Sequence, residues 1–173
     1  ATRVPYTPTA FQPLAATATS NIPLTFTPTI APPTSTPNPY EKYTIAAMRS
    51  RSYGTGRIEL LEELSDEGSF QRYKFRYPSD GIMIYGFVNI PKGEGPFPAI
   101  ILLHGNYSTE NYALMPYTTY YADQIVKQGY VVFHPNLRNF GESGKGDDRY
   151  RTGQAADVLN LTPMIQAQGG QIG

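Results

Sequence analysis

Two short apolar runs without a polar interruption, at residues 99–103 and 130–133, constrain the fold of this chain more than any other feature. Such runs are typical of parallel strands that are covered on both faces. The segment between them, 117–128, has apolar residues at helical spacing, and Gly129 follows where a helix carboxyl cap is expected. The sequence therefore predicts a right-handed βαβ unit and a parallel sheet. The apolar positions of the helix are Tyr121, Ala122, Ile125 and Val126.

The residues that lead into this unit favour shorter elements. Residues 40–51 predict a short helix. Residues 57–64 predict a strand, because their main apolar side chains share one parity, and the polar residues 65–68 signal a turn after it. The apolar side chains of that parity are Ile58, Leu60 and Leu64.

Basic and aromatic residues alternate along 72–77, which predicts a half-buried strand with its basic face in water. The aromatic positions are Tyr73, Phe75 and Tyr77, and the basic ones are Arg72, Lys74 and Arg76. Residues 78–81 then close a hairpin. Residues 82–90 are apolar on both parities and predict a strand inside the sheet.

A second helix is predicted at about 153–168, after the βαβ unit. Its apolar face, directed at the sheet, is expected to carry Ala155, Val158, Leu159 and Ile165. Pro163 lies inside the pattern and is expected to bend or interrupt the helix, since an interior proline costs about 3 kcal/mol.

Residues 1–39 have a different composition from the rest of the chain. They hold nine of the sixteen prolines, with repeated Thr-Pro steps, and Arg3 is their one charged residue. Proline removes amide donors and favours extended backbone, so we expect a disordered, solvated tether and a folded domain at 40–173. The sequence opens at Ala1 with neither an initiator methionine nor a basic-then-apolar signal, so we expect a processed or cropped form. The tether favours an extracytoplasmic protein, secreted or attached to the cell envelope.

Composition excludes several classes of function. The 14 basic and 14 acidic residues cancel, which argues against a nucleic-acid partner. No cysteine and only two histidines are present, so we expect neither a metal site nor a thiolate nucleophile, and no cofactor. The longest aliphatic run, 99–103, is far shorter than the ~20 residues of a membrane-spanning helix.

Four consecutive segments together resemble the amino-terminal portion of one enzyme family. They read "PFPAIILLHGNY", "YADQIVKQGY", "VVFHPNLRNFGESG" and "AADVLNLTPMIQAQGG", with "YPSDGIMIYGFVNIPKG" ahead of them. From about Tyr43 onward the chain is similar to the prolyl-oligopeptidase-like branch of the α/β-hydrolases. The resemblance implies an incomplete α/β-hydrolase fold, in which antiparallel amino-terminal strands lead into a parallel sheet with flanking helices. It also implies a serine hydrolase that acts on peptides or, as the alternative, on simple esters.

The resemblance assigns site residues to the loop after the first apolar run. In the family this strand is the third of eight, and the loop after it supplies an oxyanion-hole donor. That donor maps to the backbone N–H of Asn106, with Tyr107 as a weaker candidate for the oxyanion or the substrate. A backbone N–H at the carboxyl end of a rigid strand can be directed at developing negative charge without reorganising.

Other polar residues near this loop are expected to have structural roles. The family's His-Gly pair, here His104 and Gly105, is structural, and the catalytic histidine lies near the carboxyl terminus. Arg138 and Ser143 match a turn that braces the loops around the site. His134 is as consistent with a packed, hydrogen-bonded imidazole as with any other role.

The catalytic nucleophile, acid and base are not recognisable in this sequence. The G-x-S-x-G motif of the fold is absent, and in 141–145 a lysine replaces the final glycine. Nor is 144–146 a phosphate-binding loop, because Gly146 replaces the Ser or Thr that binds magnesium. The resemblance places the missing strand and its motif after Gly173. Strand 99–103 is then expected to have an unpaired aliphatic edge, prone to aggregation, and the chain alone is expected to be inactive.

Two other functions fit parts of the sequence. A non-catalytic binding or scaffold protein would retain half of the fold and use the tyrosines at 107, 112, 117, 120 and 121 as a recognition surface. A cell-surface stalk would need only the Thr/Pro segment, which leaves the βαβ pattern unexplained. The substrate and the oligomeric state are left open by the sequence.

Overall fold

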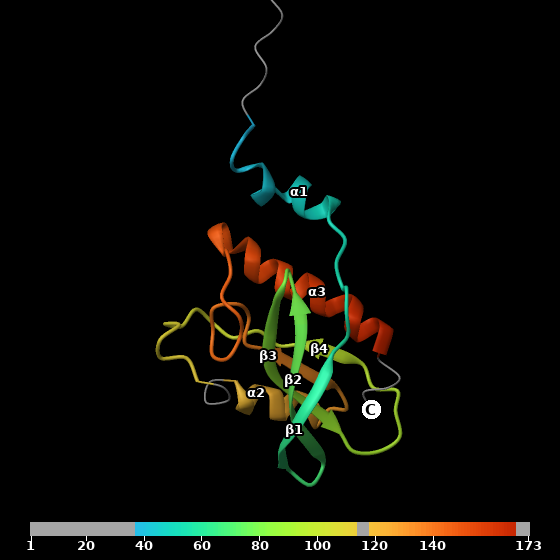
Figure 1. Ribbon diagram of the computed structural model, residues 1–173. Coiled ribbons are helices and arrows are strands. Elements are labelled where there is room, and N and C mark those ends of the chain that lie inside the picture. The colour runs from blue at the N-terminus through green and yellow to red at the C-terminus, as the bar shows by residue number, and fades with distance from the viewer. Residues whose placement is uncertain (1–36, 114–117, 169–173) are drawn as a thin grey trace, which may run out of the picture. The chain divides into compact units, whose positions relative to one another are not determined.

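A five-stranded mixed sheet organises the residues that the computed structural model describes, 37–113 and 118–168 (Figure 1). Its strands are β1 Glu59–Asp66, β2 Phe70–Ser79, β3 Ile82–Pro91, β4 Ala99–Ile101 and β5 Val131–Pro135, in the order β1-β2-β3-β5-β4. The first three pair antiparallel, β3 pairs antiparallel with β5, and β4 pairs parallel with β5. This confirms the predicted α/β class and is consistent with an incomplete α/β-hydrolase fold. The predicted tether, 1–39, lies almost entirely outside the described residues.

Helices cover both faces of the sheet, and the side chains of β5 point alternately toward one face and the other. Val131 and Phe133 pack with Leu161 and Met164 of α3 (Thr152–Gln168), which runs across the strands in Figure 1. Val132 points the other way and packs with residues of α2 (Thr119–Val126). Two apolar clusters, one on each face, therefore hold the three layers together.

The β2–β3 hairpin turns sharply at Asp80 and Gly81, with φ values of 50° and 83°. Ser79 pairs with Ile82, so the loop has two residues and needs left-handed backbone at both of them. This confirms the hairpin predicted at 78–81. In the neighbouring β1–β2 pair the register shifts twice between Leu60 and Ser65. This pairing confirms the strand predicted at 57–64, in which Ile58 is buried and Leu60 is 41% exposed.

Strand β4 is the edge of the sheet within the described residues, as predicted for 99–103. Its residues Ala99, Ile100 and Ile101 pair with Val131, Val132 and Phe133, which confirms the parallel βαβ unit. The expectation that 99–103 is covered on both faces is wrong, because Ala99 and Leu103 are exposed. An edge strand has neighbours on one side, so its side chains lose part of their cover.

Arg72, on the basic face of β2, is buried and does not lie in water, which corrects the prediction for this residue. Its side chain is 7% exposed, bonds to Asn89 Oδ1 at 2.9 Å and pairs with Asp123 of α2. The guanidinium also lies 5.3 Å from the centre of the Phe87 ring. Helix α2 covers this face, so the buried cation is neutralised by a partner from the covering helix.

Helix α2 confirms the predicted helix over its described part, with Gly129 after it at a φ of 87°. Ala122 and Val126 are buried as expected, but Tyr121 is 61% exposed. The predicted start at residue 117 lies outside the described residues.

Helix α3 has the predicted length, and Ile165 is buried as predicted, but the rest of its buried face differs from the prediction. Ala155 and Leu159 are exposed, whereas Asp157 and Asn160 are buried toward the sheet. The helix also continues through Pro163 to Gln168, so of the expected bend or interruption the interruption is wrong.

The helix predicted at 40–51 is divided into a 3-10 turn, η1 (Glu41–Tyr43), and α1 (Ile45–Ser50). Thr44 separates them with extended backbone, and its side chain accepts a hydrogen bond from Ala47 N–H as an amino-terminal cap. Among the described residues, no helix combines the length and the apolar character needed to cross a membrane.

Candidate functional site

The carboxyl ends of β4 and β5 lie at the same end of the sheet. The loops that follow them carry the candidate site residues predicted from the sequence. Parallel strands of α/β sheets present ligand-binding loops at this end. The loop after β4 holds His104, Asn106 and Tyr107, and the loop after β5 holds Arg138 and Ser143. The β2–β3 turn lies at the same end, because β3 runs antiparallel to β5.

His104 joins the two loops. Its Nδ1 lies 2.8 Å from the carbonyl oxygen of Gly105, and its Nε2 lies 2.7 Å from that of Asn136, after β5. Rings of Tyr112 and Phe140 pack against the imidazole at centroid distances of 4.8 and 4.5 Å. Since both ring nitrogens face backbone carbonyls, the arrangement supports a structural role and opposes a role as general base.

Asn106 and Tyr107 are on the exposed part of the same loop. Asn106 Oδ1 accepts a hydrogen bond of 3.2 Å from Arg151 Nη2. Its backbone N–H donates to no other described residue. The Tyr107 side chain is 36% exposed, with its ring 6.3 Å from those of His104 and Tyr112. The Asn106 N–H is therefore available to an external acceptor.

Ser143 is buried and committed to the backbone. It is 6% exposed, and its hydroxyl oxygen accepts a hydrogen bond of 3.0 Å from Tyr85 N–H in β3. The Ser143 N–H donates to the carbonyl of Phe140 at 3.0 Å. These contacts tie the 136–148 loop to the sheet and suit a brace better than a nucleophile.

A buried network surrounds Arg138. Its guanidinium donates to Asp157 Oδ1 at 2.8 Å and to Asp80 Oδ2 at 3.2 Å, and its backbone N–H donates to Asp157 Oδ2 at 2.8 Å. Asp157 is fully buried and also accepts from the Ser79 hydroxyl at 2.7 Å. Asn160 completes the network with a bond of 3.0 Å to the same hydroxyl. The network joins helix α3, the hairpin turn and the loop after β5.

Sequence reasoning missed Asp157, Asp80 and Asn160. One signal was present: the polar pair Asp157 and Asn160 lies three positions apart in a helix, on one face. Hydrophobic periodicity favours the helix face with the aliphatic residues instead. A buried carboxylate needs a partner, and the local pattern does not identify one.

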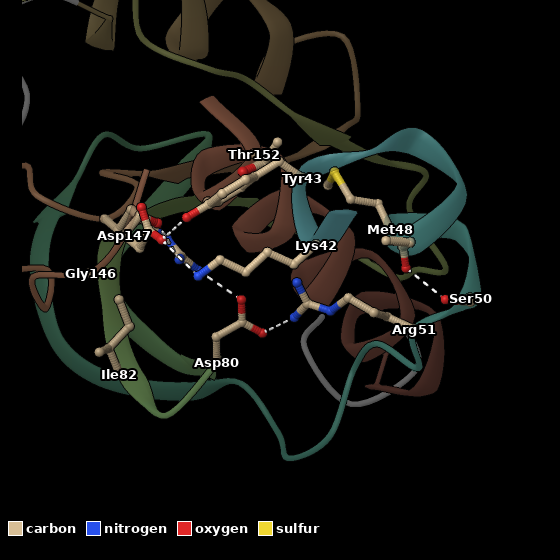
Figure 2. Close-up of a pocket in the computed structure, with 13 residues that line it drawn as sticks. Lys42, Tyr43, Met48, Ser50, Arg51, Asp80, Ile82, Gly146, Asp147 and Thr152 are labelled. Atoms are coloured by element: carbon tan, nitrogen blue, oxygen red, sulfur yellow. Dashed lines mark hydrogen bonds and ion pairs between the residues drawn. The ribbon is translucent and has the colours of Figure 1, made fainter. Parts of the chain in front are cut away.

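A cavity of about 590 Å³ lies between the amino-terminal helices and these loops (Figure 2). Lys42 and Tyr43 point toward Asp147, and Arg51 points toward Asp80. Hydrogen bonds from Arg149 and from Tyr43 hold the pKa of the Asp147 carboxyl well below its usual range. The charged groups of the cavity wall are thus paired with one another. Among the described residues, no three His, Asp or Glu side chains are placed to hold a metal ion.

His134 is buried on β5 beneath this site. It stacks on Phe87 at 4.7 Å, and its Nε2 lies 2.7 Å from the Thr118 hydroxyl. Burial, and after it the nearby His104, lowers the pKa of His134 from 6.5 to about 4. His134 therefore packs as a neutral imidazole in the folded protein at neutral pH.

Acid is expected to destabilise the protein through His134 before the carboxylates titrate. The unfolded chain binds a proton near pH 6.5 and the folded chain only near pH 4, so the full contribution is present above pH 6.5. It falls as the pH drops through this window, by up to about 3 kcal/mol. Urea unfolding at several pH values should show this slope, and His134→Gln should reduce it. An equal slope in the variant would assign it to other groups.

Comparisons with known proteins give a limited likeness. No protein-family model and no curated protein matches the sequence. An acetyl xylan esterase from Thermoanaerobacterium sp. has 21% identity and a TM-score of 0.43, over 69% of this chain and 39% of its own. A cold-adapted esterase from an Arctic intertidal metagenomic library has 18% identity and a TM-score of 0.46, over 70% and 51%. The chain thus spans less than two thirds of either enzyme.

Proposed function

We propose that this chain contributes the first half of a serine hydrolase active site, with Asn106 N–H as an oxyanion-hole donor. The observation that carries the proposal is the position of this N–H, free of partners among the described residues, at the carboxyl end of parallel strand β4. Tyr107 is the second candidate in the same loop.

The surroundings of Asn106 support this role. His104 fixes the start of the loop to the chain after β5 through the 2.7 Å contact of its Nε2 with the carbonyl oxygen of Asn136. Arg138 and Ser143 fix the facing loop to α3 and to β3. A donor held in this way loses little free energy by reorganising as negative charge develops on the substrate oxygen.

The remaining catalytic groups are proposed to come from a strand that pairs with the outer edge of β4. Within the described residues that edge has no partner strand. A strand at this position would bring its carboxyl end, and a serine on the turn after it, next to the Asn106 loop. The acid and the general base would follow in the chain, in the order typical of this kind of hydrolase.

Esters are the first substrates to test, and peptides are the second. The choice follows the names of the two structural neighbours and sets only the order of testing. In either case the serine hydroxyl attacks the acyl carbon while the general base takes its proton, and the oxyanion accepts a hydrogen bond from the Asn106 N–H. The alcohol or amine then leaves with that proton, and water hydrolyses the acyl-serine to release the acid and restore the serine hydroxyl.

The experiment begins with the gene sequence after the codon for Gly173. We expect a G-x-S-x-G motif with a later Asp and His, and hydrolysis of an aryl ester by the extended protein. Residues 1–173 alone are expected to show no turnover. Turnover by this shorter chain that Ser143→Ala abolishes would contradict the proposed place of the nucleophile. An immediate stop codon with a soluble, monomeric product would instead favour a binding or scaffold protein.

A matched pair of variants in the extended protein tests Asn106 itself. Asn106→Pro removes the backbone N–H and is expected to lower kcat by about 10²–10³-fold. Asn106→Ala keeps the N–H and loses only the Oδ1 acceptor, so it separates the contribution of the side chain and should retain more activity than Asn106→Pro. Full activity of Asn106→Pro would show that this N–H does not bind the oxyanion.

A further inference from the structure

A guanidinium links the Asn106 loop to helix α3. Arg151 Nη2 donates to Asn106 Oδ1 at 3.2 Å, and Nη1 donates to Asp148 Oδ2 at 3.3 Å. The two contacts use different nitrogens of one planar group, so the guanidinium bridges two acceptors at a fixed angle. It thereby connects positions 45 residues apart in the sequence.

Asp148 gives this bridge a rigid base. Its side chain is 10% exposed. Its carboxylate accepts from Gln154 N–H at 2.9 Å and from Gln154 Nε2 at 2.8 Å, in the first turn of α3. The Arg151 end of the bridge is therefore attached to a helix that packs on the sheet core.

The backbone at Arg151 is strained in a way that serves the bridge. Tyr150 and Arg151, within the 3-10 turn η2 (Arg149–Arg151), have φ values of 56° and 61°. Left-handed backbone is unfavourable for a residue that carries a side chain. Such strain persists where surrounding contacts hold it, often at functional sites. Here it accompanies a contact of Tyr150 with the Tyr43 ring, at 5.6 Å, and of Arg151 with Asn106.

We propose that Arg151 is a positioning residue, which holds the Asn106 loop in one conformation and so directs the Asn106 N–H. The inference rests on the proposed function of Asn106, but the mechanical link can be measured separately. Residues 105–110 are all exposed, so side-chain packing does little to fix the loop. The contact between Arg151 and Asn106 supplies a restraint there.

The test is an NMR measurement of backbone order in the ¹⁵N-labelled chain. Arg151→Gln should lower the order parameter of the Asn106 amide from about 0.85 to below about 0.6, with little change in Tm. Arg151→Lys keeps the charge but cannot reach both acceptors, so it should behave like Arg151→Gln. The matched control is Arg149→Gln, which removes a charge from the same turn. Arg149 bonds to Asp147, and the control should leave Asn106 ordered.

A second variant protects the test against misfolding of the strained turn. Asn106→Ala removes the acceptor and leaves the turn intact, and the Gly105 and Tyr107 amides should then lose order. If Arg151→Gln and Asn106→Ala both leave the loop as ordered as before, the inference is wrong. If the order of the loop depends on Arg151 but Asn106→Pro is fully active in the extended protein, the proposed function is wrong. The link between Arg151 and the Asn106 loop would still hold.

Discussion

Asp157→Asn is expected to lower the free energy of unfolding by about 3–5 kcal/mol, because it removes the fully buried carboxylate that pairs with Arg138 and leaves only the partly exposed Asp80 as a counter-ion. The carboxylate is fully buried and accepts hydrogen bonds from Arg138 and Ser79. An amide would turn a donor toward those donors, while Arg138 stays 5% exposed. Since a domain of this size is stable by about 5–15 kcal/mol, a large share of its stability would be lost. Urea unfolding followed by circular dichroism measures the change.

The matched control for this prediction is the same substitution at an exposed ion pair. Asp66 pairs with Lys92 at 2.7 Å, and both side chains are more than 40% exposed. Asp66→Asn is expected to leave the urea midpoint nearly unchanged, because solvent screens an exposed ion pair. A loss of less than 1 kcal/mol for Asp157→Asn would show that the Arg138 network contributes little to stability.

Gly86→Ala is expected to disrupt the pairing of β3 with β5 and to cost about 3 kcal/mol or more. A Cβ at Gly86 would lie 2.2 Å from the His134 carbonyl oxygen and 2.8 Å from Pro135 Cα. Both atoms belong to the neighbouring strand, which pairs with Gly86 through Pro135. Backbone cannot rotate away as a side chain can, so the strands must separate. Thermal and urea unfolding measure the loss.

Gly105→Ala is the control, because it adds the same methyl group at an exposed loop position. The nearest atom to its Cβ would be 3.7 Å away, an ordinary contact. A change within about 0.5 kcal/mol is expected there. Similar losses for the two variants would contradict a specific backbone clash at Gly86.

The order and type of the elements could be predicted because their signals are local. The apolar runs at 99–103 and 130–133 and the turn at 78–81 each determine their own backbone within a few residues. The parallel pairing of β4 with β5 followed from the helix between them. These predictions are confirmed by the strand pairing.

Buried faces were harder to predict, because their partners are distant in sequence. Arg72 is buried since Asp123, 51 residues later, covers it from α2. Asp157 faces the sheet since Arg138 lies 19 residues before it. Hydrophobic periodicity gives such polar residues to the solvent face, so it misplaced Arg72 and Asp157, although Phe75, Tyr77 and Ile165 are buried as predicted.

The candidate site was only partly accessible from the sequence. The resemblance identified Asn106, His104, Arg138 and Ser143, and the structure places all four at one end of the sheet. Their roles stay predictions. The link from Asn106 to Arg151 could not be foreseen, because it depends on left-handed backbone at Arg151, which that residue type does not favour.

The strand order β3-β5-β4 has a consequence for synthesis on the ribosome. The first three strands are consecutive and can pair as soon as they emerge. Strand β4 emerges before β5, although β5 occupies the place between it and β3. At about 5–20 residues per second, the nascent aliphatic segment waits roughly 2–6 seconds for β5 to be made. During this interval residues 99–103 have no strand partner in the sheet.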